Sequence, residues 1–339
     1  FSQLNNTHIP MFNFYTFEVN QAEDKGNLFA NDPESDNQRI YKTPIECFGS
    51  FFATNSILLL PVLKSRGSAR EKEFSNENYK CDVIRGEEGV ILLTIENNKV
   101  KHTIVNKKDI ANEHHPFCHI LIDNRPGKQI IGIERHAAFD QNTDKVATIL
   151  KMGMNHHLSN YHLTMSIALL KKKRADFWEI VDEVRIKFND IVRQIRFDFN
   201  GKQEANEANR LITLINELAR KSDSMGALIL NAEGNGEIKL KEIYEDITNL
   251  ANICLSSKCY DLTVKFKNFG IYRYGAEQLA QFGVDEQLLN SFASGVRQIG
   301  FEDSDNAYAL IDWLDKLSEL LQGYAKINIQ QGRKACRRR

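Results

Sequence analysis

The sequence predicts an α+β fold, in which an N-terminal antiparallel β-meander domain is followed by a C-terminal mixed α/β domain. The first observation is a series of strand-like runs over residues 79–135, separated by Gly, Asn-Asn and Pro-Gly turns. The second is the change after Ser159 to strands that alternate with amphipathic helices, which is typical of such layers. The expected division is a β-rich domain over 11–160, an α/β domain over 161–325 and a basic tail over 326–339.

The N-terminal domain is predicted to consist mainly of strands. Met11–Val19 reads as a strand, and a helix is expected from Thr43, because Pro44 suits the first helical position. The polar segments 21–39 and 64–78 are expected to be loops. The meander is predicted at Tyr79–Arg85, Val90–Glu96, Lys99–Val105, Phe117–Asp123 and Gln129–Arg135, with a closing helix at Asp140–Leu158.

The C-terminal domain shows both structural periods. Apolar residues at 3.6-residue spacing predict helices, and two-residue alternation predicts strands. The expected helices are Phe177–Phe188, Glu204–Lys221, Lys241–Leu255 and Asn306–Leu321. The expected strands are Tyr161–Leu170, Asp190–Asn200 and Tyr260–Phe266, with a hairpin formed by Gly226–Glu233 and Glu237–Leu240.

Composition limits the functional classes. The 339 residues are 42% apolar and 26% charged, and the formal net charge is −1, so contact with nucleic acid requires a local basic patch. The longest apolar run, Ile57–Leu63, is too short to cross a bilayer, and no signal peptide is visible. The six cysteines show no paired framework. We therefore expect a cytoplasmic protein with no membrane insertion and no cofactor, in which residues 1–10 are an extension and the tail is disordered.

A run of basic residues makes nucleic acid the first candidate partner. It lies between a predicted strand and a predicted helix, so its charges are expected on a surface connection. Each phosphate contact that such residues make would neutralise one charge, and binding would weaken with salt. The run consists of Lys171, Lys172, Lys173 and Arg174.

A second basic group is expected on a sheet. If the strands predicted at 190–200 and 260–266 are neighbours, alternation places Arg196, Lys265 and Lys267 on one open face. Arg273 follows in the tripeptide Tyr272-Arg273-Tyr274, which interleaves aromatic and basic side chains as nucleic-acid stacking surfaces do. The alternative is that these cations only solubilise the sheet.

Metal-dependent catalysis is the second hypothesis. The predicted hairpin carries Glu237-Ile238-Lys239, and Mg²⁺-dependent nucleases place an acidic residue and a Glu-x-Lys on such a hairpin. Asp223 is the candidate upstream acid. Most of the nine histidines lie between His102 and His162, but on a strand Cys118 and His119 would point to opposite faces, which argues against zinc.

Two further groups have a functional and a structural interpretation. Arg125, Glu134 and His136 form a polar trio near the Pro-Gly turn, which suggests either an acid–base pair or a salt bridge that closes a hairpin. The helix predicted at 306–321 adds Tyr308 and Trp313 to its apolar stripe. This stripe suggests a third hypothesis, a protein-interaction subunit acting as a homodimer, with core packing as the alternative use.

The order of elements over residues 79–270 resembles that of Rex-type phage-exclusion proteins and of the B component of the Kiwa anti-phage system. The segments that carry the resemblance are CHILIDNRPGKQIIGIER, DFWEIVDEVRIKFNDIVRQIRFDFN, ALILNAEGNGEIKL and YDLTVKF. The resemblance implies a bacterial or phage-borne defence protein that binds DNA or senses an infection product. Together with the basic groups, it makes a non-catalytic DNA-binding component of anti-phage defence the first functional hypothesis.

Overall fold

The chain forms an α+β structure with one large antiparallel sheet, as the sequence predicts. It divides into two compact units: unit 1 comprises Phe1–Phe14 and Leu170–Ala325, and unit 2 comprises Tyr15–Leu169 and Lys326–Arg339. The computed structural model describes residues 9–21, 51, 57–65, 72–97, 99–105, 108–161, 163–172, 177–199, 210–256, 260–275, 278–298 and 308–328. Within these ranges no helix has the length and apolar character needed to cross a membrane.

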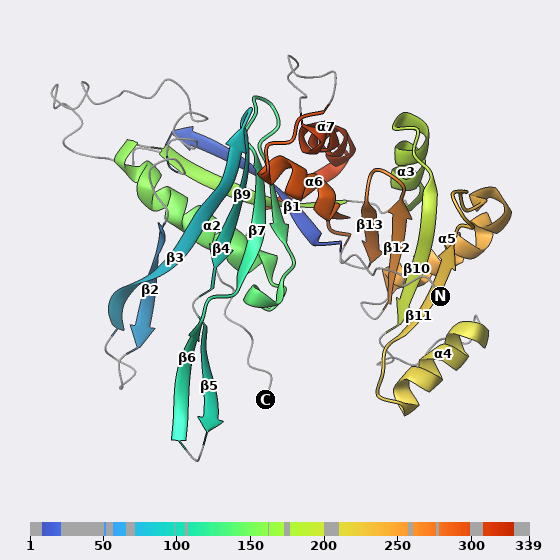
Figure 1. The fold of residues 1–339 in the computed structure, drawn as a ribbon, viewed down its shortest axis with the longest axis horizontal. Helices are drawn as coiled ribbons and strands as arrows, with labels where there is room; N and C mark the ends of the chain where they lie inside the picture. Colours follow the sequence, from blue (N-terminus) through green and yellow to red (C-terminus); the bar gives the residue numbers. More distant parts are fainter. Residues whose placement is uncertain are drawn as a thin grey trace. The chain divides into compact units, whose positions relative to one another are not determined.

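Unit 2 is built on strands in the order β1-β8-β7-β4-β3-β2, and β9 pairs with β1 (Figure 1). Two of these strands are shared with unit 1: the residues of β1 up to Phe14 and the residues of β9 from Leu170 onward belong to unit 1. The strands are β1 (Met11–Gln21), β2 (Ile57–Ser65), β3 (Lys72–Glu87), β4 (Val90–Glu96), β7 (Phe117–Asp123), β8 (Ile130–Glu134) and β9 (Leu163–Lys172).

The core of unit 2 lies between this sheet and the helix α2 (Thr143–Leu158). The helix begins where the Asn142 side chain accepts a hydrogen bond from the Lys145 N–H at 3.0 Å, as an N-cap residue does. Residues two apart on a strand share a face, and the apolar face of each central strand is buried with one side of the helix. The core includes Leu93, Ile95, Ile120, Ile122, Ile131, Ile133, Val146, Ile149 and Leu150.

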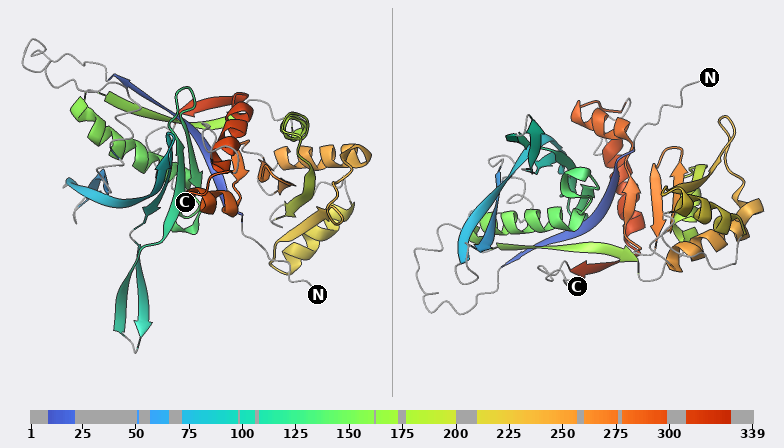
Figure 2. Two further views of the ribbon diagram at one scale, coloured as in Figure 1. Left: turned by 45° about the horizontal axis from the view of Figure 1, so that its top comes forward. Right: turned by 90° about the horizontal axis from the view of Figure 1, so that it is seen from below.

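The predicted meander is interrupted by a ribbon of two strands, β5 (Lys99–Val105) and β6 (Lys108–His114). These strands pair with each other as a separate sheet, and the ribbon extends away from the ends of β4 and β7 (Figures 1 and 2). Strand β4 instead pairs directly with β7, so the predicted strand-to-strand order is wrong at this point. The sequence also did not predict β6 or the first half of β3, because their charged residues resemble loops, and it did not predict the apolar strand β2. The helix expected from Thr43 lies outside the described residues, apart from Phe51.

Unit 1 has the strand order β11-β10-β12-β13-β14-β1, and all of these pairs are antiparallel. Its strands are β10 (Val192–Phe199), β11 (Gly226–Asn231), β12 (Tyr260–Phe266), β13 (Ile271–Gly275) and β14 (Gln281–Gly283), together with the first two residues of β15 (Tyr324–Asn328), which continues into unit 2. Its helices are α3 (Phe177–Asp182), which continues as a π-helix over Glu183–Lys187, α4 (Arg210–Lys221), α5 (Tyr244–Ser256), α6 (Glu286–Ala293) and α7 (Ala309–Leu321). Short 3-10 turns lie at Leu240–Ile243 in unit 1 and at Ala137–Phe139 and Ser159–Tyr161 in unit 2.

Aromatic side chains fill the core of unit 1. The ring of Trp313 on α7 lies 6.0 Å from Phe14 and 5.7 Å from Phe269, and its indole N–H donates to the Phe269 carbonyl at 2.6 Å. Trp313 and Tyr308 are 3% and 2% exposed, so the apolar stripe of α7 belongs to the core. This burial contradicts its use as a docking surface and supports the alternative that the sequence left open.

Candidate nucleic-acid interface

Three of the predicted cations lie on one face of the sheet in unit 1. Arg196 on β10 is opposite Thr263 on β12, and Thr263 is opposite Arg273 on β13. Residues directly opposite in an antiparallel pair point to the same side, and Lys265, two residues after Thr263, joins them. Two strand spacings separate the arginines by about 10 Å, and Lys265 lies about 7 Å further along its strand. Strands β10 and β12 are therefore neighbours in one sheet, which is the condition that the sequence left open.

The opposite face of these strands is buried. Phe197, Leu262 and Tyr274, which alternate with the cations, are each under 5% exposed. Phe177 of α3 contacts Tyr274 at a ring distance of 5.4 Å, and α5 packs on β12 and β13. The apolar face thus fixes the direction in which the basic face points. We call the basic side, with Arg196, Thr263, Lys265 and Arg273, the open sheet face.

Two carboxylates offset part of this charge. The Arg196 Nε donates to Asp198 at 2.8 Å, and the Arg273 guanidinium bonds the Asp261 carboxylate. The hydrogen bond that Arg196 donates to Asp198 raises the pKa of Arg196, which stays charged. Lys265 has no ion-pair partner within the described ranges. The i, i+2 spacing of Arg196 and Asp198 on one strand is a sequence signal that predicts the first pair.

The remaining predicted basic residues are placed differently. Lys172 on β9 is 6% exposed, and its Nζ contacts Glu179 at 2.5 Å and lies 5.7 Å from the centre of the Tyr324 ring. This contradicts the expected exposure of Lys172, because strand β9 continues to this residue and turns it inward. The backbone of Lys171 forms an isolated antiparallel β-bridge with Leu279, and Lys267 is exposed just after β12. Lys173 and Arg174 lie outside the described residues.

The expected aromatic stacking surface is wrong. Tyr272 and Tyr274 are 2% and 4% exposed, and only Arg273 between them faces the open side. The Tyr272 ring stacks on Phe282 at 5.5 Å, and burial raises its pKa well above the ordinary value. Strand alternation explains the difference, because it sends the two tyrosines into the core and the arginine outward.

The predicted nuclease hairpin is also wrong. Strand β11 pairs with β10, whereas the segment after it forms a loop whose Gly234 and Gly236 carbonyls accept hydrogen bonds from the Arg193 guanidinium. Lys239 is exposed and lies 4.0 Å from Glu242. Across the described ranges, no group of three or more His, Cys, Asp or Glu side chains is arranged to hold a metal ion.

The polar trio of unit 2 is divided between structural contacts. The Glu134 carboxylate accepts from the His119 backbone N–H at 2.9 Å and contacts its Nδ1 at 2.8 Å. Burial raises the pKa of Glu134, but the bonds from His119 outweigh it and hold the pKa below its ordinary value. Arg125 instead holds the buried Asp123 with two guanidinium hydrogen bonds of 2.9 and 2.7 Å. His136 caps the turn that follows β8, because its Nδ1 accepts from the Ala138 N–H.

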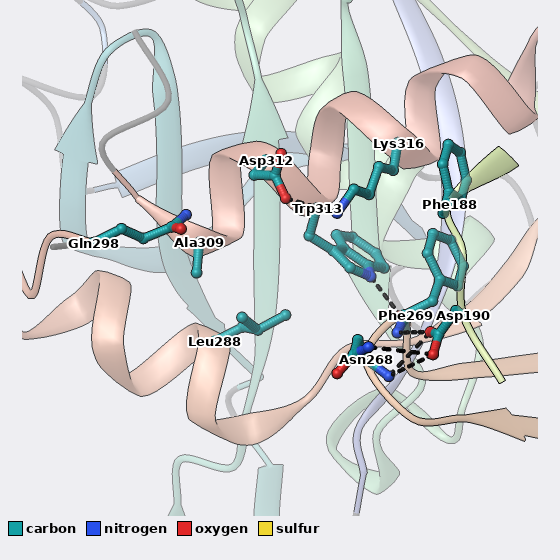
Figure 3. A pocket seen from close by; sticks show the side chains of 10 residues that line it. All are labelled: Phe188, Asp190, Asn268, Phe269, Leu288, Gln298, Ala309, Asp312, Trp313 and Lys316. Carbon is teal, nitrogen blue, oxygen red and sulfur yellow. Dashed lines mark hydrogen bonds and ion pairs between the residues drawn. The ribbon is translucent and has the colours of Figure 1, made fainter. Parts of the chain in front are cut away.

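A pocket of about 270 Å³ lies between the turn that joins β12 and β13 and the helices α6 and α7 (Figure 3). Its charged groups already have partners: Asp190 accepts from the backbone N–H groups of Asn268 and Phe269 at 3.0 and 2.7 Å, and Lys316 pairs with Asp312 at 2.8 Å. Sequence reasoning missed Asp190 because the Asn268 N–H that donates to it lies 78 residues away along the chain. We interpret this pocket as a structural junction.

Comparison with known proteins identifies no relative: no known protein family, no curated protein and no solved structure matches the chain.

Proposed function

We propose that this protein binds the phosphate backbone of nucleic acid through the open sheet face. The observation that carries the proposal is the register that brings Arg196, Lys265 and Arg273 from three strands onto one solvent-facing side. Guanidinium groups suit phosphate because they donate parallel hydrogen bonds. No buried cavity is needed for such contacts, since the phosphates lie on the outside of the ligand.

The carboxylates on this face are compatible with phosphate binding. The Arg196–Asp198 pair is partly exposed, at 45% and 24%, and exposed pairs contribute only about 0–1 kcal/mol to stability. A phosphate can therefore displace such a carboxylate at low cost. With Tyr272 and Tyr274 buried, the face offers charge without base-stacking rings, so we expect little discrimination between sequences. The resemblance to phage-exclusion proteins adds the proposal that this binding serves anti-phage defence.

The test is the affinity for a labelled DNA strand measured by fluorescence anisotropy over a range of salt concentrations. We expect binding that weakens with salt, with a logarithmic slope of about −0.7 for each phosphate contacted on a single strand. The variant Arg196→Gln/Lys265→Gln/Arg273→Gln should lose most of this affinity and reduce the slope by about 2.

The matched control removes the same charge elsewhere on unit 1, by Lys221→Gln/Lys239→Gln/Lys241→Gln. Lys221 and Lys239 are 71% and 78% exposed and are also paired with glutamates. The control should bind as the wild type does. Equal losses in both variants, or no wild-type binding at low salt, would contradict the proposed function.

A further inference from the structure

Strand β11 is the outermost strand of the sheet in unit 1, and no other described strand pairs with its outer edge (Figure 1). The Ala232 N–H donates to the Arg193 carbonyl at 2.8 Å, which continues the register of β11 with β10. Because bonding direction alternates along an antiparallel pair, the even-numbered residues of β11 bond to β10. Ala227, Ile229 and Asn231 therefore direct their N–H and C=O groups to the opposite side. No described residue bonds to them there.

The sequence of this strand lacks the charges and prolines that normally prevent strand pairing. The sequence of β11, GALILN, contains no charged residue and no proline, and its residues Ile229 and Leu230 are 42% and 38% exposed. Strand β2, at the other end of the strand order, contains both Pro61 and Lys64. An open, neutral and apolar edge is a template for another strand.

We propose that two copies of this chain pair through β11, antiparallel, about a two-fold axis between their Ile229 residues. In that register the outward groups match completely: Ile229 faces Ile229 of the other copy, and Ala227 faces Asn231 in both directions. Each of these residues can exchange both backbone hydrogen bonds with its counterpart. Centring the axis on Leu228 or Leu230 instead leaves an outward residue without a counterpart.

The side chains suit this pairing as well. Ile229 meets Ile229 on the open sheet face, while Leu228 and Leu230 meet each other on the opposite face. No like charges are brought together, because β11 is neutral. A stable interface buries about 1,200–2,000 Å² in total, more than one strand pair supplies. The helix α4, which packs beside β10 and β11, adds apolar surface through Leu214 and Leu218, which are 54% and 57% exposed.

The pairing would extend the proposed nucleic-acid surface, a consequence that rests on the proposed function. A two-fold axis perpendicular to the sheet keeps the open sheet faces of both copies on the same side. Strand order would run β13-β12-β10-β11 and then the reverse in the other copy. Three strand spacings would place the two Arg196 residues about 14 Å apart. One nucleic acid could then contact both basic clusters.

The test is the molar mass of the full chain, measured by light scattering after size exclusion in the absence of nucleic acid. We expect the wild type at twice the 38.9 kDa chain mass and Ile229→Lys at the chain mass, because two lysines would face each other at the axis. The control is Ile327→Lys, an isoleucine of similar exposure (46%) on β15, which should remain dimeric.

Charge exchange tests the register. A mixture of Ile229→Lys and Ile229→Glu should form a heterodimer, because residue 229 faces itself across the axis. If circular dichroism shows that one variant alone is poorly folded, the mixture still tests the pairing. A monomeric wild type, a dimeric Ile229→Lys, a monomeric Ile327→Lys or the absence of a heterodimer would each overturn the pairing. A dimer that binds no DNA would overturn only the proposed function.

Discussion

At the residue scale, Asp190 is the clearest example of a polar group used for structure. Its side chain is 5% exposed, and it accepts hydrogen bonds from the backbone of Asn268 and Phe269 (Figure 3) and from the backbone N–H of Ile191. A carboxylate that satisfies several buried N–H groups joins the start of β10 to the turn between β12 and β13. The side chain therefore holds together the strands that form the open sheet face.

We predict that Asp190→Ala lowers the free energy of unfolding by about 2–4 kcal/mol, because it leaves buried N–H groups without acceptors. Urea denaturation measures this change. The control is Asp312→Ala in the same pocket, where the exposed pair with Lys316 contributes about 0.3–0.5 kcal/mol. Equal effects of the two substitutions would show that Asp190 does not have this structural role.

His157 of unit 2 makes stability depend on pH. Its ring lies 4.9 Å from Phe51 and 5.4 Å from Tyr161, and its Nε2 is buried with no hydrogen-bond partner in the described part of the chain. Burial lowers the pKa of His157 below its ordinary value of 6.5, and the nearby His156 adds to this effect. His157 is therefore harder to protonate in the folded protein than in the unfolded chain.

The sign of the effect follows from this difference. The contribution of neutral His157 is complete above about pH 6.5, falls as the unfolded chain gains its proton, and levels off below the lowered pKa. We predict that unfolding free energies measured by denaturant between pH 7 and pH 5 decrease. His157→Phe should flatten this decrease, whereas His156→Gln should leave most of it. An unchanged pH profile in His157→Phe would contradict the assignment.

At the scale of elements, β10, β12 and β13 combine arginines with their own carboxylates. Asp198 and Asp261 lie directly opposite each other, and each is bonded by an arginine of the open sheet face. Removing both negative charges would remove the two carboxylates that compete with phosphate for the cations. The two aspartates therefore limit the affinity that the proposed function predicts.

We predict that Asp198→Asn/Asp261→Asn binds DNA about 3- to 10-fold more tightly than the wild type, which corresponds to about 0.7–1.4 kcal/mol. Anisotropy titration at fixed salt measures the gain. Glu242→Gln/Glu245→Gln, at exposed positions in the 3-10 turn before α5 and in the first turn of α5, makes the same change in net charge and should have a much smaller effect. A loss of affinity in the first variant would contradict the proposed role of the face.

Most of the elements could be predicted from the sequence, because alternation and 3.6-residue spacing are local patterns. Their pairing could not. The sequence placed Arg196 and Lys265 on one face correctly, but it also offered Lys172 and Tyr272 as surface residues, and both are buried. Burial depends on how far a strand continues and on what covers it. Strand β6 was missed because its charged residues suit either a loop or a two-stranded ribbon.

At the scale of the whole molecule, unit 1 is closed by residues from the start of the chain. Phe12 and Phe14 on β1 are fully buried, and the Gln281 side chain donates to Asn13 at 2.6 Å. Phe14 packs against Phe282 at 6.1 Å and against Trp313 at 6.0 Å. The sequence-based domain limits separate these residues from the unit that they complete.

We predict that Phe14→Ala lowers the free energy of unfolding by about 3–5 kcal/mol, because it opens a cavity among these rings. The control is Phe117→Ala, a phenylalanine on β7 that is 46% exposed and should cost less than about 1 kcal/mol. Thermal and urea unfolding of both variants measure the difference. Similar costs at the two positions would show that the N-terminal residues do not close unit 1.

The participation of β1 in unit 1 also bears on how the chain matures during synthesis. Asn13 and its partner Gln281 are 268 positions apart, and a ribosome that adds about 5–20 residues per second needs tens of seconds to cover that distance. Throughout that interval Phe12 and Phe14, which are buried in the folded protein, lack the side chains that cover them. Nascent chains of this protein should therefore depend on holding chaperones more than their length alone suggests.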